Sequence, residues 1–278
     1  MPSATASSPG GALWDIVLPQ HESRVPGVAM AGFRARGDDL VDIRVVPYPA
    51  ATVAFDLTGG LVVVNDVDGP EVAGSVAAGL APGGARGVGH HIECLQLRLS
   101  PVVSHAVLGD SANLAGAVVP LDEVWGPDAA QFVDRLRAAG TWRDRFSMVK
   151  DEVVSRLEQR APVDPEVAFA WRRMVGTHGQ VRIEQLAADV EWSRKRLWSR
   201  FRAQVGVTPK RAARLIRFDH AAHRLAAGLG PARVAAETGY TDESHLHRDA
   251  RDFIDLTPTA IASAPWLSVD EVAWANGT

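Results

Sequence analysis

The sequence has 278 residues, a hydrophobic fraction of 46% and a net charge of −4, enough chain to bury the core of one large domain or two of ordinary size. Its single cysteine, Cys94, excludes an internal disulfide framework and a cysteine-rich zinc site, and it favours a reducing, cytoplasmic setting. No apolar run approaches the ~18 residues of a membrane span, so no membrane partner is expected.

The charge is divided unevenly along the chain. Residues 1–162 carry 13 Lys and Arg against 19 Asp and Glu, whereas residues 163–262 carry 16 against 12. Such asymmetry indicates that only the second half meets a polyanion. We therefore expect two domains with different partners.

The first half predicts a β-rich domain over residues 12–160. Residues 1–11, rich in Ser, Ala, Gly and Pro, predict a disordered N-terminus with no export signal. Short apolar or alternating runs, broken by Gly, Pro and Asp, predict strands at 28–34, 42–46, 51–57, 60–65, 72–78 and 92–99. Several such strands predict a small antiparallel sheet or barrel.

Helices are expected to follow these strands. Pro101 opens a short helix to Leu108, and Pro127 with Asp128 starts another that ends near residue 139. A further helix begins after Thr141, a suitable N-cap, so that residues 127–160 form a helical hairpin. The two prolines in residues 161–165 then predict a domain boundary.

One cluster in this half has the residue types of a metal site. His90 and His91 are adjacent and would point to opposite faces of a strand, but His91 and Glu93 share one face. That pair keeps open a cupin-type metal-dependent enzyme with a helical appendage. Cys94 lies in an apolar run and is expected to be a buried core thiol. We predict no catalytic residue, no resident metal and no cofactor.

The second half, residues 165–262, contains an internal repeat. The first copy reads Leu186-Ala187, Glu191-Trp192-Ser193, Leu197, Phe201, Gly206 and Thr208-Pro209. The second copy reads Val234-Ala235, Gly239-Tyr240-Thr241, Leu246, Ala250, Asp255 and Thr257-Pro258. The offset is 48 residues before the turn and 49 after it, which indicates two copies of one supersecondary unit.

Each copy has the pattern of a helix-turn-helix. A short helix, 182–188 or 231–237, precedes a turn and a second helix, which is capped by Ser193 in the first copy and by Thr241 with Asp242 in the second. A helical stripe over residues 210–227 predicts a linker helix between the copies. Its 18 residues would span ~27 Å, which suits two recognition helices about one DNA turn apart, ~34 Å.

The first copy and the linker carry an unbroken run of positive charge. Between Trp192 and Phe218 there are nine basic residues and no acidic one, although the whole chain is acidic. Leu197 and Phe201 stand four apart, so they share one helix face and leave the cations around the other. This arrangement predicts a short helix, 193–202, that presents charge to DNA.

Residues 165–262 resemble the DNA-binding domain of the AraC/XylS family of bacterial transcription regulators. The resemblance rests on both half-motifs, on the linker Arg214-Leu-Ile-Arg217 and on Gly239-Tyr-Thr-Asp-Glu-Ser-His-Leu246. The first half resembles, through weaker motifs, the sensor-like domain of actinobacterial members, which in the family is commonly a cupin-like effector or dimerisation domain. The resemblance implies an α+β multidomain fold: a β-rich cupin-like domain with a helical hairpin, then an all-α domain with two helix-turn-helix units joined by a linker helix, and a tail at 263–278.

The resemblance also implies site residues. The base-contacting positions are Lys195, Trp198, Ser199, Glu243, Ser244, His245 and Arg248. The phosphate-contacting positions are Arg194, Arg196, Arg200, Arg202, Lys210 and Arg211. For Trp198, packing against the linker helix is the alternative.

This chain departs from the family pattern at several places. Glu191 stands at the turn glycine of the first unit, Ala250 replaces an aromatic residue, and Asp255 replaces a glycine. Because Asp242, Glu243 and Asp249 repel phosphate, the second recognition helix is expected to bind more weakly than the first.

The function expected from the sequence is that of a sequence-specific DNA-binding transcription regulator rather than an enzyme. Double-stranded DNA is the predicted partner; RNA polymerase, an unidentified small-molecule effector and a second copy of the chain are further candidates. The metal-dependent enzyme and a protein-interaction module, whose basic helices bind an acidic protein, are the alternatives. The sequence leaves open the promoter, activation or repression, the effector and the oligomeric state.

Overall fold

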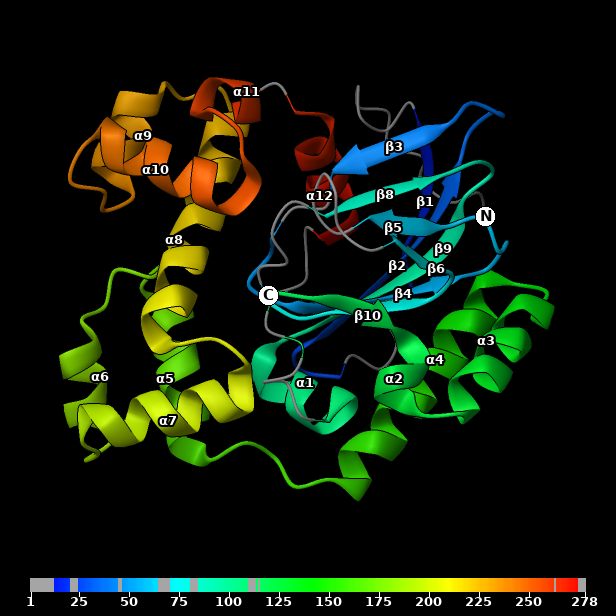
Figure 1. The fold of residues 1–278 in the computed structure, drawn as a ribbon, viewed down its shortest axis with the longest axis horizontal. Helices are drawn as coiled ribbons and strands as arrows, with labels where there is room; N and C mark the ends of the chain where they lie inside the picture. Colours follow the sequence, from blue (N-terminus) through cyan, green and yellow to red (C-terminus); the bar gives the residue numbers. More distant parts are fainter. Residues whose placement is uncertain are drawn as a thin grey trace.

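The fold is a β-rich N-terminal half beside a helical C-terminal half (Figure 1). The computed structural model describes residues 13–20, 25–44, 47–64, 71–80, 85–109, 114, 116–262 and 264–274. The expected disorder at 1–11, and the expected strand positions 45, 46 and 65, lie outside these residues. None of the helices in these ranges is long and apolar enough to cross a bilayer.

Ten strands form two antiparallel sheets in the described residues. They are β1 Trp14–Val17, β2 Val28–Ala35, β3 Val41–Arg44, β4 Ala51–Asp56, β5 Val62–Val64, β6 Glu71–Ala73, β7 Val76–Ala78, β8 Arg86–Gly89, β9 Glu93–Leu99 and β10 Val118–Pro120. The first sheet has the order β1-β2-β9-β4-β7-β10 and the second β3-β8-β5-β6. The expectation of an antiparallel β-rich domain is confirmed.

Helices make up the rest of the described fold. In the N-terminal half they are α1 Pro101–Leu108, α2 Leu121–Trp125, α3 Asp128–Ala138 and α4 Trp142–Gln159. In the C-terminal half they are α5 Pro165–Gly176, α6 Ile183–Asp189, α7 Arg194–Val205, α8 Pro209–Ala226, α9 Pro231–Glu237, α10 Glu243–Ile254, α11 Pro258–Ala262 and α12 Pro265–Trp274. The predicted hairpin is confirmed as α3 and α4, and the Thr141 side chain accepts a hydrogen bond from the Asp144 amide at 3.1 Å.

The pleat of β9 divides the N-terminal half into two packed layers. Leu95, Leu97 and Leu99 are fully buried and belong to the same core as the residues of α3 and α4. The alternate side chains, Cys94 and Arg98 among them, face the space between the two sheets. One strand therefore touches both the helical layer and an interior cavity.

The expected strand 72–78 is wrong as a single element. It breaks at Gly74, whose φ of 84° lies in the left-handed region, and the two pieces enter different sheets: β6 pairs with β5, whereas β7 pairs with β4 and β10. Strands β1, β8 and β10 were not predicted from the sequence. Each has only three or four residues, too few for a periodic signal.

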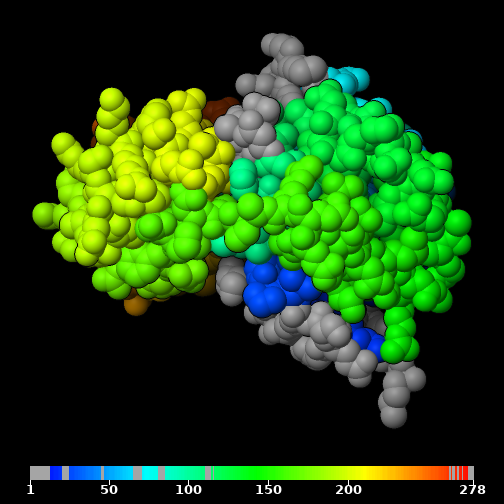
Figure 2. Space-filling view, turned by 90° about the horizontal axis from the view of Figure 1, so that it is seen from below, coloured from blue at the N-terminus to red at the C-terminus, as the bar shows by residue number. Residues whose placement is uncertain are grey.

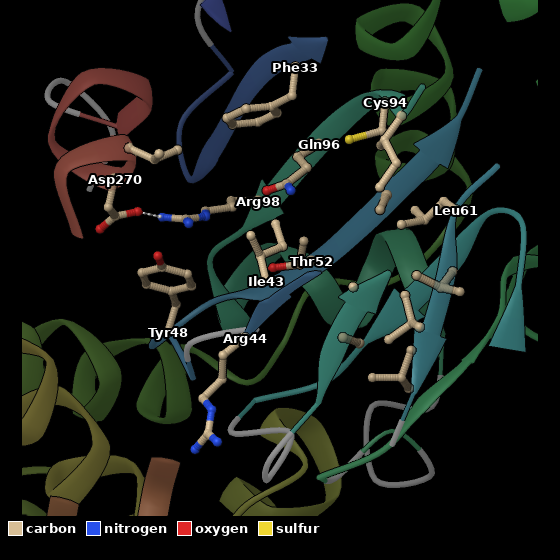
Figure 3. A pocket seen from close by; sticks show the side chains of 18 of the residues that line it. Phe33, Ile43, Arg44, Tyr48, Thr52, Leu61, Cys94, Gln96, Arg98 and Asp270 are labelled. Carbon is tan, nitrogen blue, oxygen red and sulfur yellow. Dashed lines mark hydrogen bonds and ion pairs between the residues drawn. The ribbon is translucent and has the colours of Figure 1, made fainter. Parts of the chain in front are cut away.

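The two sheets enclose an apolar cavity of about 160 Å³. Its walls are largely aliphatic and aromatic, and Figure 3 shows Phe33, Leu61 and Cys94 around it. Burial raises the pKa of the Cys94 thiol to about 12, so the expected buried core thiol is confirmed. Charged groups gather at one end, where the Arg98 guanidinium meets Asp270 (Figure 3).

Asp270 belongs to α12, which lies in the segment expected only as a tail. In Figure 1 this helix, in red, lies between the C-terminal helices and the sheets, and it packs on β1, β2 and α8. Its Oδ1 accepts from Arg98 Nη1 at 2.7 Å, and its Oδ2 lies 2.9 Å from His223 Nε2 on α8. The chain thus returns from its last helices to the N-terminal half.

The two halves also touch on the opposite side. Figure 2 shows the face seen from below in Figure 1, with the helices of residues 165–205 at one end and α3 and α4 at the other. The chain segment that joins them crosses between these two ends. There α1 packs against α4, α5 and α7. Gln204 Oε1, at the end of α7, accepts from the Asp164 amide at 2.9 Å.

The contact between α12 and α8 predicts a pH dependence. The hydrogen bond that the His223 ring donates to Asp270, together with the nearby Asp219 carboxylate, raises the pKa of His223 to about 9, from 6.5. A raised pKa means that the stabilisation is complete below about pH 6.5 and is lost as pH rises through 9. Of the facing carboxylates, Asp219 has a pKa raised to about 6 by burial, whereas for Asp270 burial is outweighed by the hydrogen bonds from His223 and Arg98, which lower its pKa, so both are ionised above pH 7.

Between pH 7 and 10, the thermal midpoint of the wild type is expected to fall about 2–4 °C further than that of His223→Gln. This shift corresponds to about 1 kcal/mol, a value reduced because a third of the ring meets solvent. Calorimetric scans of both proteins at matched ionic strength measure it. Parallel midpoints across the window would show that His223 carries no such charge.

Candidate nucleic-acid interface

The predicted repeat is confirmed by backbone hydrogen bonds that recur at the same offsets. The Trp192 amide donates to the Ala187 carbonyl at 2.9 Å, and the Tyr240 amide donates to Ala235 at 3.0 Å, 48 residues later. Ala187 and Ala235 are both buried where the paired helices cross. The two units are therefore α6 with α7 and α9 with α10.

A side-chain hydrogen bond caps the start of the second helix in each unit. The Ser193 hydroxyl accepts from the Arg196 amide at 3.2 Å, and Asp242 Oδ1 accepts from the His245 amide at 2.7 Å. These N-caps satisfy donors that have no partner inside the helix. Asp242 is thus used in capping α10.

Two of the residues that replace an expected glycine adopt the left-handed backbone conformation of a glycine. Glu191 has φ 54° in the first turn where Gly239 has φ 77° in the second, and Asp255 has φ 50° at the end of α10 where Gly206 ends α7 with φ 89°. Both acidic residues hold a left-handed conformation that glycine adopts without a Cβ penalty.

A buried ion cluster attaches α10 to the linker helix α8. Asp249 is 1% exposed; its Oδ1 accepts from Arg214 Nη2 at 2.7 Å, and its Oδ2 lies 3.6 Å from Arg217 Nη2. The expectation that Asp249 repels phosphate is therefore wrong, because this carboxylate faces the protein. Of the three acids named for the second helix, Glu243 is the one exposed and not used as a cap.

The outer face of α7 carries an exposed stripe that includes two cations. Lys195, Trp198, Ser199 and Arg202 follow the spacing of one helix face and are all exposed, opposite the fully buried Leu197 and Phe201. The Trp198 side chain is 46% exposed, and the Arg202 guanidinium lies 5.3 Å from its ring centroid. Trp198 thus points outward rather than packing on the linker helix.

The remaining cations of α7 are engaged to different degrees. Arg194 meets Glu184 at 3.1 Å in a largely exposed pair, and such pairs are weak and easily exchanged. Arg196 lies over the Trp192 ring at 4.4 Å. Both can turn toward a phosphate at little cost.

Arg200, one of the predicted phosphate contacts, forms an ion pair with a carboxylate of the protein itself. Its Nε and Nη2 donate to the two oxygens of Asp164, at 2.6 and 2.8 Å, and the pair holds the pKa of Asp164 low. Arg200 occupies the position equivalent to Asp249 in the second unit. At this position both units form a strong ion pair with the protein itself.

The start of α8 provides two more of the expected cations. Lys210 is exposed, and Arg211 is half-buried with its guanidinium 5.7 Å from the Phe253 ring centroid. The Arg211 amide donates to the Thr208 hydroxyl at 3.2 Å, which caps this helix.

The second recognition helix presents a more neutral face. Glu243, Ser244 and Arg248 are exposed, whereas the half-buried His245 ring packs edge-on against Tyr240, with centroids 5.2 Å apart. The offset of 49 residues places His247 where the first unit has Trp198, and Arg251 where it has Arg202. These two residues were not among the predicted DNA contacts, although the repeat spacing identifies them.

The residues of the alternative metal site do not come together. Burial raises the pKa of Glu93, but hydrogen bonds from Arg34 and Arg145 outweigh this and lower it. His91 instead lies 3.5 Å from Asp38 in an exposed pair. Among the described residues, no group of three or more His, Cys, Asp or Glu could hold a metal ion.

Comparison with known families identifies the C-terminal half. Residues 186–264 match the family described as "Helix-turn-helix domain". That match begins inside α6 and continues through α7, the linker helix α8, α9, α10 and α11. No protein with a curated description matches the sequence.

Several solved structures resemble the fold at low identity. ToxT from Vibrio cholerae O395 is 9% identical, with a TM-score of 0.45 over 87% of this chain and 98% of that one. The C-terminal domain of AraT, a response regulator from Geobacillus stearothermophilus, is 17% identical, with a TM-score of 0.34 over 36% of this chain and 85% of that one. The AraC-like transcriptional activator CuxR is 18% identical, with a TM-score of 0.24 over 74% and 86%. At this level of similarity, the ligands and mechanisms of these proteins are not assigned to this chain.

The two turns offer a matched stability test. Glu191→Gly is expected to raise the free energy of unfolding by about 0.5–1 kcal/mol, because glycine relieves the left-handed conformation. Gly239→Ala should lower it by more than about 1 kcal/mol, because a Cβ there would lie 2.7 Å from the Gln180 side chain at φ 77°. Urea unfolding of both variants measures these values; changes of the same sign would contradict the assignment of equivalent turns.

Proposed function

We propose that this chain, whose residues 186–264 match a helix-turn-helix domain family, is a DNA-binding transcription regulator of the AraC type that reads two successive major-groove segments with α7 and α10. The linker helix supports this arrangement. α8 has 18 residues and so spans ~27 Å, close to one DNA turn of ~34 Å. The protein would act where its DNA is, in the cytoplasm.

The exposed stripe on α7 is the observation that carries the proposal. Lys195, Trp198 and Ser199 stand in the first half of the helix, the part that approaches base edges when a recognition helix enters the groove. Lysine donates to guanine, serine bonds to either partner of a base pair, and an indole contacts a thymine methyl group. In this proposal α7 is the main reader of sequence.

The second helix reads with a different chemistry. Glu243 accepts from a cytosine amino group, and Arg248 suits guanine. Ser244 and His245 complete the positions expected from the motif, and His247 joins them as the counterpart of Trp198. With Asp249 buried, the weakness proposed for this helix rests on Glu243 and on the exposed cap Asp242.

Phosphate contacts fix the domain on the duplex. The proposed set consists of Arg194, Arg196, Arg202, Lys210 and Arg211. Arg200 would join it only by giving up both hydrogen bonds to Asp164, so we assign it to positioning α7. RNA polymerase and a second copy of the chain are the further partners that the family resemblance adds.

We also propose that the cavity receives a small, largely apolar effector. Its volume of about 160 Å³ is close to that of engineered apolar cavities that bind benzene. The walls include the buried side chains Phe33, Ala54 and Val63, which hold no charge. The charged end at Arg98 and Asp270 adjoins the C-terminal half.

Lys195→Ala tests base reading. On a duplex selected from a random library by the wild type, this variant is expected to lose about 1–3 kcal/mol of binding free energy, with a smaller loss on random duplexes. Lys210→Ala is the matched control and should lose equally on both, because a phosphate contact ignores sequence. Fluorescence anisotropy titrations at fixed salt measure these binding free energies. If Lys195→Ala loses equally on selected and random duplexes, Lys195 contacts phosphate rather than a base.

Toluene tests the cavity. At about ten times its Kd it should stabilise the wild type by about 1.4 kcal/mol and raise the thermal midpoint by about 3–5 °C. In Ala54→Phe the added ring fills the space, so the midpoint should not rise. The same rise in both proteins would mean that toluene binds elsewhere.

A further inference from the structure

The last helix of the described chain forms part of the cavity wall. Val269, Asp270 and Trp274 of α12 line it together with strands of both sheets. The Trp274 ring packs against Phe33 with centroids 6.3 Å apart. Since α12 begins directly after the matched helix-turn-helix residues, the cavity is closed by an extension of the C-terminal half.

Arg98 stands where the cavity meets that extension. Its guanidinium lies 3.4 Å from the Tyr48 ring centroid and 4.0 Å from that of Trp274, and its Nη1 donates to Asp270. The side chains of Arg98 and Asp270 are 12% and 5% exposed. A charge pair so far from water is stable only while both members and their hydrogen bonds stay in place.

The chain of charges continues to α8. His223 has an acceptor at each ring nitrogen: Asp270 Oδ2 at 2.9 Å from Nε2, and the Asp219 carbonyl oxygen at 2.8 Å from Nδ1. Both nitrogens therefore donate, and the ring is a cation. Arg98, Asp270 and His223 form one continuous link from the cavity to the helix that joins the two helix-turn-helix units.

A second arginine of the cavity wall also reaches the C-terminal half. Arg44 of β3 donates to the carbonyl of Ile254, at the end of α10, where a cation suits the helix dipole. In Figure 3 its side chain points away from the other lining residues. Both arginines that line the cavity thus bond to the C-terminal half.

Arg98 also has unused hydrogen-bonding capacity. Its Nε is buried and has no hydrogen-bond partner among the described residues. A buried donor without a partner is costly, so an acceptor brought into the cavity gains from binding it. An apolar molecule with one hydrogen-bond acceptor matches both the walls and this donor.

We propose that α12 is a latch: an apolar ligand carrying one hydrogen-bond acceptor draws Arg98 away from Asp270, opens the link to His223 and changes the affinity of the helix-turn-helix domain for DNA. The proposal rests on the effector role of the cavity given above. Once Arg98 turns, the Asp270 carboxylate loses a partner in a buried place, which favours movement of α12 toward water. α8 then loses its contact with the N-terminal half.

Because Cys94 is the single cysteine and lines the cavity, a thiol reagent can attach a group at a known position inside it. 4-Acetylbenzyl methanethiosulfonate would place an aromatic ring with one carbonyl acceptor on Cys94 inside the cavity, with Cys94→Ser as the unreactive control. The adduct is expected to change the Kd for the selected duplex at least fivefold in the wild type, within the usual range of coupling. In Asp270→Asn the unmodified protein should already show the shifted Kd, and the adduct should add less than twofold. An equal shift in both proteins, or none in the wild type, overturns the latch.

The rate at which Cys94 reacts measures opening directly. With 5,5′-dithiobis(2-nitrobenzoate), Asp270→Asn and His223→Gln should react at least tenfold faster than the wild type. Glu152→Gln is the matched control, because it breaks an arginine pair in the same half without touching the cavity or Cys94, and its rate should stay within twofold. Equal acceleration in Glu152→Gln would show general loosening and would overturn the latch.

Two outcomes separate this inference from the proposed function. If the wild type binds its selected duplex no better than random DNA, the proposed function fails. If binding is specific but independent of the Cys94 adduct, only the latch fails. Should Asp270→Asn not fold, shown by the absence of a cooperative urea transition, the half-exposed His223→Gln carries the same test.

Discussion

The structure depends on one helix, α8, to which both helix-turn-helix units are attached. Its inner face, with Leu215, Phe218 and Leu225, is fully buried, and Asp249 of α10 pairs with two arginines of α8. Removing one partner of such a buried pair typically costs about 3–5 kcal/mol. The two recognition helices are therefore held at a fixed spacing, and whatever moves α8 changes how both meet DNA.

The N-terminal half acts on the same helix. His223 of α8 meets Asp270 of α12, and α12 in turn closes the cavity between the sheets. On the other side, α1 packs against α7, and Arg44 bonds to the end of α10. The β-rich half thus reaches the linker helix and both recognition helices, which gives an occupant of the cavity a physical route to the DNA-binding surface.

Sequence alone predicted what local chemistry determines. The repeat, the caps at Ser193 and Asp242 and the length of the linker helix follow from spacing and side-chain type. It did not predict α12, because that segment is stabilised by β2 and α8, elements distant in the chain. For the same reason the pairing of Arg200 and the burial of Asp249 stayed hidden: both are set by tertiary partners, whereas sequence pattern shows only their charge.

In the proposed complex, α7 and α10 read the same face of one duplex, one helical turn apart. A hydroxyl-radical footprint on the duplex selected by the wild type tests it most directly. We expect two protected blocks whose centres are separated by about 10–10.5 base pairs. A single protected block, or two blocks separated by an odd number of half turns, would contradict the claim that α8 sets the spacing.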